Sequence, residues 1–234
     1  MNAANYWSQQ ALHLAAGAGH VKVVKLLLEK GAQIHAREEN GEQALHLAAG
    51  AGHVKVVKLL LEKGAQVDAS CNNGRQALHR ASRHVKVVKL LLENRAQVNA
   101  TDNNGKTPLH LAYYHGHREA IKLLLEKGAQ INAKDTRKEL RLTRGMQYGR
   151  QALHRASRHA EVVKLLLDRR ANVNAKNEYD QQALHYAAYH GQVDAVEFLL
   201  GCRADVTVKD NQERTPAMLA RDRGHTEVAE LLTV

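Results

Sequence analysis

Fifteen histidines are the residues of this 234-residue chain whose types and spacing most readily suggest chemistry. Six follow a leucine and six precede an apolar run, so twelve of them recur at two fixed places of a repeating segment. No Cys-x-x-Cys or His-x-x-x-His spacing, typical of closed zinc sites, is present. We therefore expect no metal and no cofactor. The three histidines outside the two sets are His35, His115 and His190.

Catalytic motifs are also missing from the sequence. It contains no Gly-rich phosphate loop, no Gly-x-Ser-x-Gly elbow and no His-Glu-x-x-His pair. Its acids fall mostly on expected helix surfaces or in turns, where nothing pairs them across a cleft. We therefore expect that the protein is not an enzyme.

The histidines recur because the whole chain is repetitive. Residues 10–33 return letter for letter at 43–66, four further copies carry substitutions, and a divergent copy closes the chain. The steps between the Leu-His markers are 33, 33, 31, 44, 31 and 33 residues. A fixed period of this size indicates a stack of small structural units rather than one globular core. The markers are His13, His46, His79, His110, His154 and His185, with Met218 in the seventh place.

Each copy predicts two short helices. In the first copy we expect helices over residues 10–17 and 21–30, joined by a turn that contains glycine. The spacing of Val21, Val24, Leu27 and Leu28 predicts the buried stripe of the second helix. Gly31 follows at the place where a left-handed residue often ends a helix. The Asn-Gly pair that ends residues 38–41 then predicts a tight turn.

A 33-residue period in which Leu-His-x-Ala opens a short helix resembles the ankyrin repeat. The Thr-Pro-Leu-His-Leu-Ala copy that begins at Thr107 matches the signature fully, and the resemblance extends from about Ser8 to Leu232. It implies an all-α repeat solenoid, an ankyrin-type stack of helix-turn-helix units with projecting β-turn fingers. We expect one domain, 1–234, with units at about 5–37, 38–70, 71–101, 102–134, 135–176 (finger insertion 137–147), 177–209 and 210–234 as the C-terminal cap.

Several copies depart from the ankyrin pattern. Five begin with Gln-Ala where the family has Thr-Pro, and Gln caps a helix less well than Thr. Residues 74–84 and 149–159 share eleven letters and lack two residues of the first helix and its turn. They place Arg80 and Arg155 where other copies have Leu14, Leu47 or Leu111, so we expect these two units to pack least well.

The two ends of the array differ. The last copy carries charge on both helices, as a terminal cap should. Only nine residues precede the first copy, which has the composition of an internal repeat. Either Tyr6 and Trp7 cover this end or the natural protein extends further, and we favour the second expectation.

Variable positions predict the binding residues. Units one and two have Gly-Ala where units four and six have a tyrosine followed by a histidine, and in ankyrin-like proteins this position lines a concave groove. Basic residues of units three and five lie nearby, and the fingers and the inserted segment add more. Tyr and Arg are enriched at binding hot spots, although all of these could be mere surface residues of degenerate repeats. The candidate set is Arg75, Arg83, Lys106, Tyr114, His115, Arg137, Lys138, Arg141, Arg144, Arg150, Arg158, Tyr189 and His190.

These observations predict a protein–protein interaction scaffold that holds another protein, with an acidic segment in the groove. The net charge of +10 leaves nucleic-acid binding through the basic insert as an alternative. We expect no nucleic-acid partner, because the lysines spread over the second helices rather than forming one stripe. A purely structural array of a larger protein, or a host-directed effector, is a further alternative.

The remaining composition bears on location. Two cysteines in different repeats make no disulfide framework, which favours a reducing compartment. No apolar stretch approaches the roughly 20 residues that span a bilayer, and no leader opens the chain. We expect a monomer in the cytoplasm or nucleus, or one delivered into a host cytosol, without a membrane partner.

Overall fold

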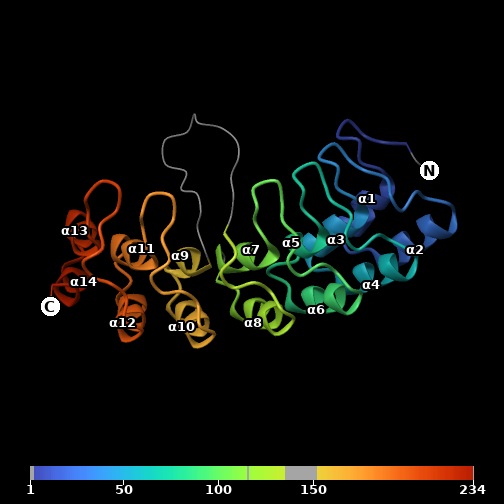
Figure 1. The fold of residues 1–234 in the computed structure, drawn as a ribbon. Coiled ribbons are helices and arrows are strands. Elements are labelled where there is room, and N and C mark those ends of the chain that lie inside the picture. The colour runs from blue at the N-terminus through green and yellow to red at the C-terminus, as the bar shows by residue number, and fades with distance from the viewer. Residues whose placement is uncertain (1–2, 115, 135–151, 234) are drawn as a thin grey trace. The chain divides into compact units, whose positions relative to one another are not determined.

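Each repeat folds into a first helix, a short turn and a second helix in the computed structural model, which describes residues 3–114, 116–134 and 152–233. These residues form fourteen α-helices (Figure 1). The first helices are α1 (Ala11–Gly17), α3 (Ala44–Ala51), α5 (Ala77–Arg80), α7 (Pro108–Tyr114), α9 (Ala152–Ala156), α11 (Ala183–Tyr189) and α13 (Pro216–Asp222). The second helices are α2 (Val21–Glu29), α4 (Val54–Glu62), α6 (Val85–Glu93), α8 (Arg118–Glu126), α10 (Ala160–Asp168), α12 (Val193–Gly201) and α14 (Thr226–Leu231).

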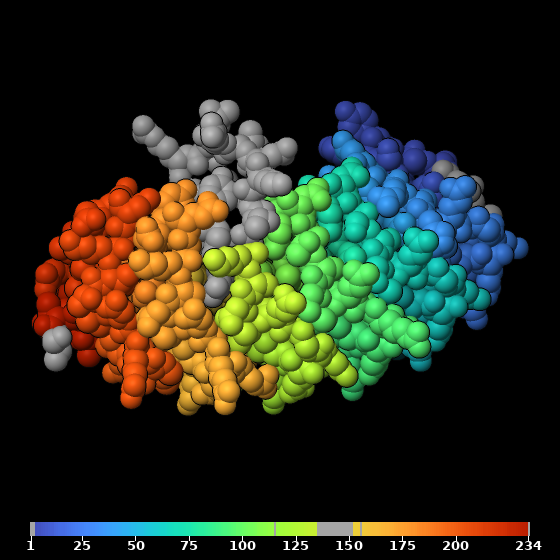
Figure 2. Space-filling view, in the orientation of Figure 1, coloured from blue at the N-terminus to red at the C-terminus, as the bar shows by residue number. Residues whose placement is uncertain are grey.

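The chain divides into two compact units. Unit 1 is Met1–Asn103 with Glu119–Ala129, and unit 2 is Asn104–Arg118 with Gln130–Val234. In unit 1 the first helices α1, α3 and α5 pack in one row and the second helices α2, α4 and α6 in another. In unit 2 the rows are α7, α9, α11, α13 and α10, α12, α14. Figure 2 shows consecutive repeats as adjoining bands, from blue to teal in unit 1 and from orange to red in unit 2.

The core of each unit is a line of small apolar side chains between successive repeats. In the second repeat Leu45, Ala48 and Ala49 of α3 are buried, as are the two valines and one leucine of the inner face of α4. Those three are Val56, Val57 and Leu60. The stripe expected from the sequence is therefore partly wrong. In the second repeat Val54 and Leu61, the counterparts of Val21 and Leu28, are only half-buried. The second helix instead turns the side that bears Val56 toward the preceding repeat.

The fingers between repeats are turns closed by a polar side chain. Glu38 Oε1 accepts hydrogen bonds from the backbone amides of Asn40, at 2.9 Å, and Glu42, at 3.2 Å. Asn177 and Asp210 occupy the equivalent positions and accept in the same way. Local side-chain acceptors of this kind fix tight turns. The third finger has Cys71 at this place, which cannot supply such an acceptor.

The two shortened repeats keep their place in the stack. Their first helices, α5 and α9, have four and five residues. Arg80 does not leave a gap. Its Nε lies 2.9 Å from Glu42 Oε1, and its Nη2 donates to Glu42 Oε2 at 3.1 Å. The arginine thereby joins its own repeat to the preceding finger. Arg155 belongs to α9, but its side chain lies outside the described part of the chain.

Candidate protein-binding surface

The marker histidines fix the frame on which a binding surface is built. Gln43 N donates to His46 Nδ1 at 3.1 Å, and His46 Nε2 lies 3.1 Å from the carbonyl oxygen of Arg75 in the next finger. Because Nδ1 accepts from an amide, the ring proton must be on Nε2, and the imidazole is neutral. The same pair of bonds holds His13, His110 and His185. Burial lowers the pKa of His46 to about 4 and also lowers the pKa of His185.

In the second set, His53 and His84 each tie their repeat to the one before it. His53 Nε2 lies 2.9 Å from the carbonyl oxygen of Gly17, and His84 Nε2 lies 3.0 Å from that of Gly50. The His53 ring fills the space where a Cβ of Gly19 would stand, and Gly19 has φ +77°. Both sets of histidines thus have structural roles, and no group of three or more metal-ligating side chains occurs among the described residues.

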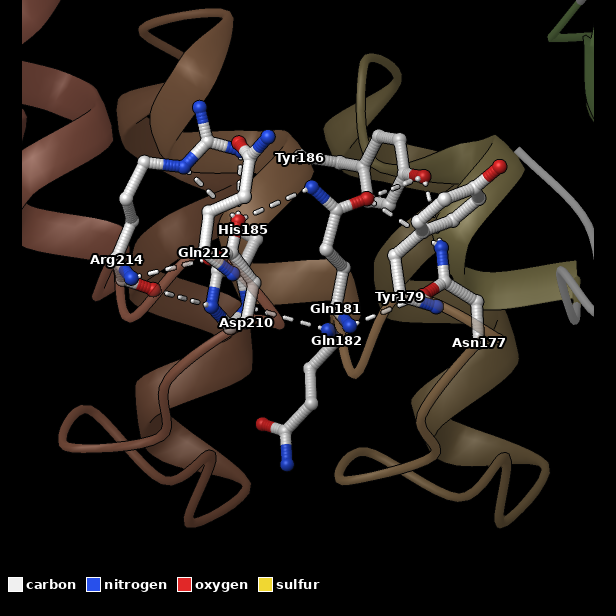
Figure 3. A network of polar contacts seen from close by, with 9 residues as sticks. All are labelled: Asn177, Tyr179, Gln181, Gln182, His185, Tyr186, Asp210, Gln212 and Arg214. Atoms are coloured by element: carbon white, nitrogen blue, oxygen red, sulfur yellow. Dashed lines mark hydrogen bonds and ion pairs between the residues drawn. The ribbon is translucent and has the colours of Figure 1, made fainter. Parts of the chain in front are cut away.

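A polar network links the last two fingers of unit 2 (Figure 3). Tyr186 Oη donates to Gln181 Oε1 and accepts from Asn177 Nδ2, both at 3.0 Å. Gln181 Nε2 then reaches Asp210 Oδ2 at 3.4 Å, and Arg214 Nη2 donates to the same oxygen at 2.7 Å. Burial of the Asp210 carboxyl opposes ionisation, but the hydrogen bonds from Arg214 and the finger amides outweigh it, so its pKa is lowered.

The ends of the first helices in unit 2 carry the largest accessible side chains of that row. Tyr114 ends α7 and is 63% exposed. Arg158 follows α9 and is exposed. Gly116, two residues after Tyr114, meets the ring of His159, which places the ends of α7 and α9 side by side. Tyr189 ends the neighbouring helix α11.

Arg223, at the end of α13, completes this row. Its guanidinium carbon lies 4.1 Å from the centroid of the Tyr189 ring, and its Nη2 donates to the Tyr189 hydroxyl. His190 meets the same ring edge to face, with centroids 5.0 Å apart. Arg223 is not among the binding residues predicted from the sequence, although it aligns with His190 in the last repeat. We name Tyr114, Arg158, Tyr189 and Arg223 the Tyr–Arg surface.

Three other predicted residues have the following settings in the structure. Arg75 forms an ion pair with the buried Asp102, with Nε 3.2 Å from Oδ2, so it braces two fingers of unit 1. Arg83, also in unit 1, is exposed and its Nη2 donates to the carbonyl of Gly50 at 3.3 Å. Lys106 in unit 2 is half-buried. The residues that lie outside the described part of the chain are His115, Arg137, Lys138, Arg141, Arg144 and Arg150.

The lysines of the second helices form a different, solvated face. Lys25, Lys58 and Lys89 are each within 3.9 Å of a glutamate four residues later, and each side chain is about two-thirds exposed. Exposed pairs of this type contribute little to stability. Part of the positive charge on these helices is therefore balanced locally.

In the described residues no helix is both long enough and apolar enough to cross a bilayer.

Comparison with known proteins agrees with this architecture. A family model described as ankyrin repeats (3 copies) matches residues 1–71, 67–135, 137–210 and 179–233. The chain is similar to the ankyrin repeat domain of human ASB11 in its crystal structure, with 25% sequence identity and a TM-score of 0.83. The match covers 97% of this chain and 99% of that one. No curated protein matches the sequence.

Proposed function

Because this chain belongs to the ankyrin repeat family, whose repeats are protein–protein interaction modules, we propose that it binds an acidic segment of a partner protein on the Tyr–Arg surface of unit 2. The partner lies across the ends of α7, α9 and α11. Tyr114 and Tyr189 supply apolar contact area, and Arg158 pairs with a carboxylate of the partner.

The exposure of Tyr114 carries this proposal. A tyrosine at the end of a packed helix offers a large ring at a low cost in conformational entropy, and residues of this type dominate binding energy at interfaces. The equivalent positions of the first two repeats are Gly17 and Gly50. Neither glycine offers a side chain, so the first two repeats lack the aromatic contact area that Tyr114 provides in unit 2.

The charge of the surface supports an acidic partner. Arg158 is exposed, and Arg223 is held over the Tyr189 ring by a cation–π contact that leaves its charge on the surface. Asp222 is also exposed beside Arg223, so the segment fits best over α7, α9 and α11. Complementary charge mainly speeds association, while the tyrosine rings that the partner covers control dissociation.

Selection of binders from a random peptide library on the full chain tests the proposal. The selected peptides should be rich in Asp and Glu. Tyr114→Ala should weaken the tightest of them by roughly 30-fold, the size of a hot-spot truncation, chiefly through faster dissociation. Arg158→Gln should slow association and reduce its dependence on salt.

Tyr6→Ala is the matched control, because Tyr6 is an exposed tyrosine of unit 1 outside the Tyr–Arg surface. It should leave peptide binding unchanged. If Tyr114→Ala and wild type bound the selected peptides with equal affinity, the Tyr–Arg surface would not be the binding site. Tight binding of a mixed-sequence oligonucleotide at physiological salt, without selection of acidic peptides, would instead favour nucleic acid as the partner.

A further inference from the structure

The tips of three fingers carry an Asn-Gly pair, the dipeptide in which a backbone nitrogen most readily attacks the preceding side chain. The pairs are Asn40-Gly41, Asn73-Gly74 and Asn104-Gly105. Asparagine is among the chemically labile residues of proteins. A following glycine has no Cβ, so its backbone nitrogen is open to the asparagine side chain. The first two of these pairs differ in how the finger around them is held.

The second finger holds its Asn-Gly pair through Glu38. Glu38 Oε1 accepts hydrogen bonds from the backbone amides of Asn40, at 2.9 Å, and Glu42, at 3.2 Å. Glu38 Oε2 accepts from Asn40 Nδ2 at 3.3 Å. Gly41 N donates to the carbonyl oxygen of Glu38 at 2.7 Å. Both the asparagine side chain and the glycine nitrogen are therefore engaged.

The third finger has the same backbone turn but lacks these side-chain bonds. Gly74 N donates to the carbonyl oxygen of Cys71 at 2.9 Å. Within the described residues, the backbone amides of Asn73 and Arg75 have no acceptor, and the side chain of Asn73 makes no hydrogen bond. Asn73 is also exposed. Its side chain can therefore rotate toward Gly74 N without losing any hydrogen bond of its own.

We propose that Asn73 is a site of spontaneous deamidation. The Gly74 nitrogen loses its proton to solvent and attacks Asn73 Cγ, the Cγ–Nδ2 bond breaks, and ammonia leaves a succinimide ring. Water then opens the ring at Cγ, which gives aspartate, or at the main-chain carbonyl, which gives isoaspartate. One amide and one water thus become a carboxylate and ammonium, and nothing is oxidised or reduced.

The difference between the two fingers sets the rate. In both, the glycine nitrogen must leave its bond to a backbone carbonyl before it can attack. In the second finger the same movement also breaks the bonds to the Glu38 carboxylate. One hydrogen bond to an ionised group corresponds to roughly a tenfold change in the population of the opened tip. Asn73 should therefore react before Asn40.

The product changes the contact between the third and fourth fingers within unit 1. The Asn73 carbonyl accepts a hydrogen bond from Asn103 N at 3.0 Å, and Asn103 Nδ2 donates to the carbonyl of Asn72 at 2.9 Å. Gly74 lies against the same residue, since an added Cβ would stand 2.3 Å from Asn103 Oδ1. Isoaspartate lengthens the main chain by a methylene and displaces the carbonyl that Asn103 contacts. Deamidation thus loosens this contact and adds a negative charge to the finger.

Incubation of the full chain at pH 8, followed by tryptic digestion and mass spectrometry, tests the proposal. Trypsin releases residues 38–55 and 64–75 as separate peptides, so one sample reports both sites, and fragmentation separates Asn73 from Asn72. A parallel incubation in urea gives the rate of each site in the unfolded chain. Relative to its own unfolded rate, Asn73 should deamidate roughly ten times faster than Asn40 in the folded chain.

Two variants exchange the residues that distinguish the fingers. Cys71→Asp supplies the acceptor that closes the last finger, where Asp210 stands, and should slow Asn73 to the rate of Asn40. Glu38→Cys should raise the rate at Asn40 and leave Asn73 as the internal control, with circular dichroism to check its folding. Equal folded-to-unfolded rate ratios at Asn40 and Asn73 in wild type would overturn the proposal. So would an unchanged rate at Asn73 in Cys71→Asp, whatever the stability of Glu38→Cys.

Discussion

Acid should destabilise this protein well before its carboxylates protonate, through the marker histidines. His46 is buried, accepts an amide proton on Nδ1 and donates from Nε2, so it must be neutral in the folded state. Its pKa is lowered from 6.5 to about 4 by burial. The folded chain thus binds fewer protons than the unfolded chain between these two values. Stability is fully present above pH 6.5 and falls as the pH drops toward 4.

The size of the effect follows from the two pKa values. At pH 5 the unfolded imidazole is almost fully protonated and the folded one is mostly neutral, so His46 alone removes about 2 kcal/mol relative to pH 8. His185, whose pKa is also lowered by burial, adds to this loss. A loss of this size is a large fraction of the stability of a typical domain.

The assay is urea unfolding at pH 8 and pH 5, followed by circular dichroism, for wild type and His46→Gln. The variant is less stable at pH 8 because it loses the ring hydrogen bonds, but it should lose about 2 kcal/mol less than wild type between the two pH values. His20→Gln, at an exposed histidine, is the control and should keep the wild-type pH dependence. An equal pH dependence of His46→Gln and wild type would refute the reasoning.

Four further substitutions should stabilise the chain, each checked by urea unfolding at pH 8. Gln76→Thr should add about 0.5–1 kcal/mol, since the buried Gln76 Oε1 makes no hydrogen bond and Thr caps a helix well. Gln43→Thr should stabilise the fold less, because Gln43 Nε2 donates a hydrogen bond to a backbone carbonyl and the variant loses that bond. Cys71→Asp should add about 1 kcal/mol by closing the third finger as acidic residues close other fingers. Arg170→Gly should add up to about 1 kcal/mol, since Arg170 has φ +62°; a loss in any of these would contradict its stated cause.

The repeat frame was predictable because every copy repeats the same local signals. The Leu-His markers, the Gly-containing turns and the 33-residue period set the helices within a residue or so, as Ala11–Gly17 and Val21–Glu29 show. Which side of the second helix is buried was predicted less well. Periodicity places Val24 and Leu27 inside, but the tilt against the preceding repeat, which decides between Val23 and Leu28, depends on tertiary packing.

The surface residues were harder to predict, because their roles depend on partners distant in sequence. Arg80 was expected to disturb the stack, yet it pairs with Glu42, 38 residues earlier. Arg75 was placed among the binding residues, and its charge is directed to Asp102. Tyr114 was chosen for its type and place, and the structure leaves most of its side chain accessible. Its role as an anchor remains our proposal.

Hydrogen–deuterium exchange of the full chain, with and without a saturating acidic peptide selected from the library, tests the central proposal most directly. The account predicts slower exchange at the ends of α7, α9 and α11 in unit 2, and unchanged exchange in α2, α4 and α6, where the exposed lysines lie. Slower exchange confined to those lysine-bearing helices, with none at Tyr114 or Tyr189, would contradict it.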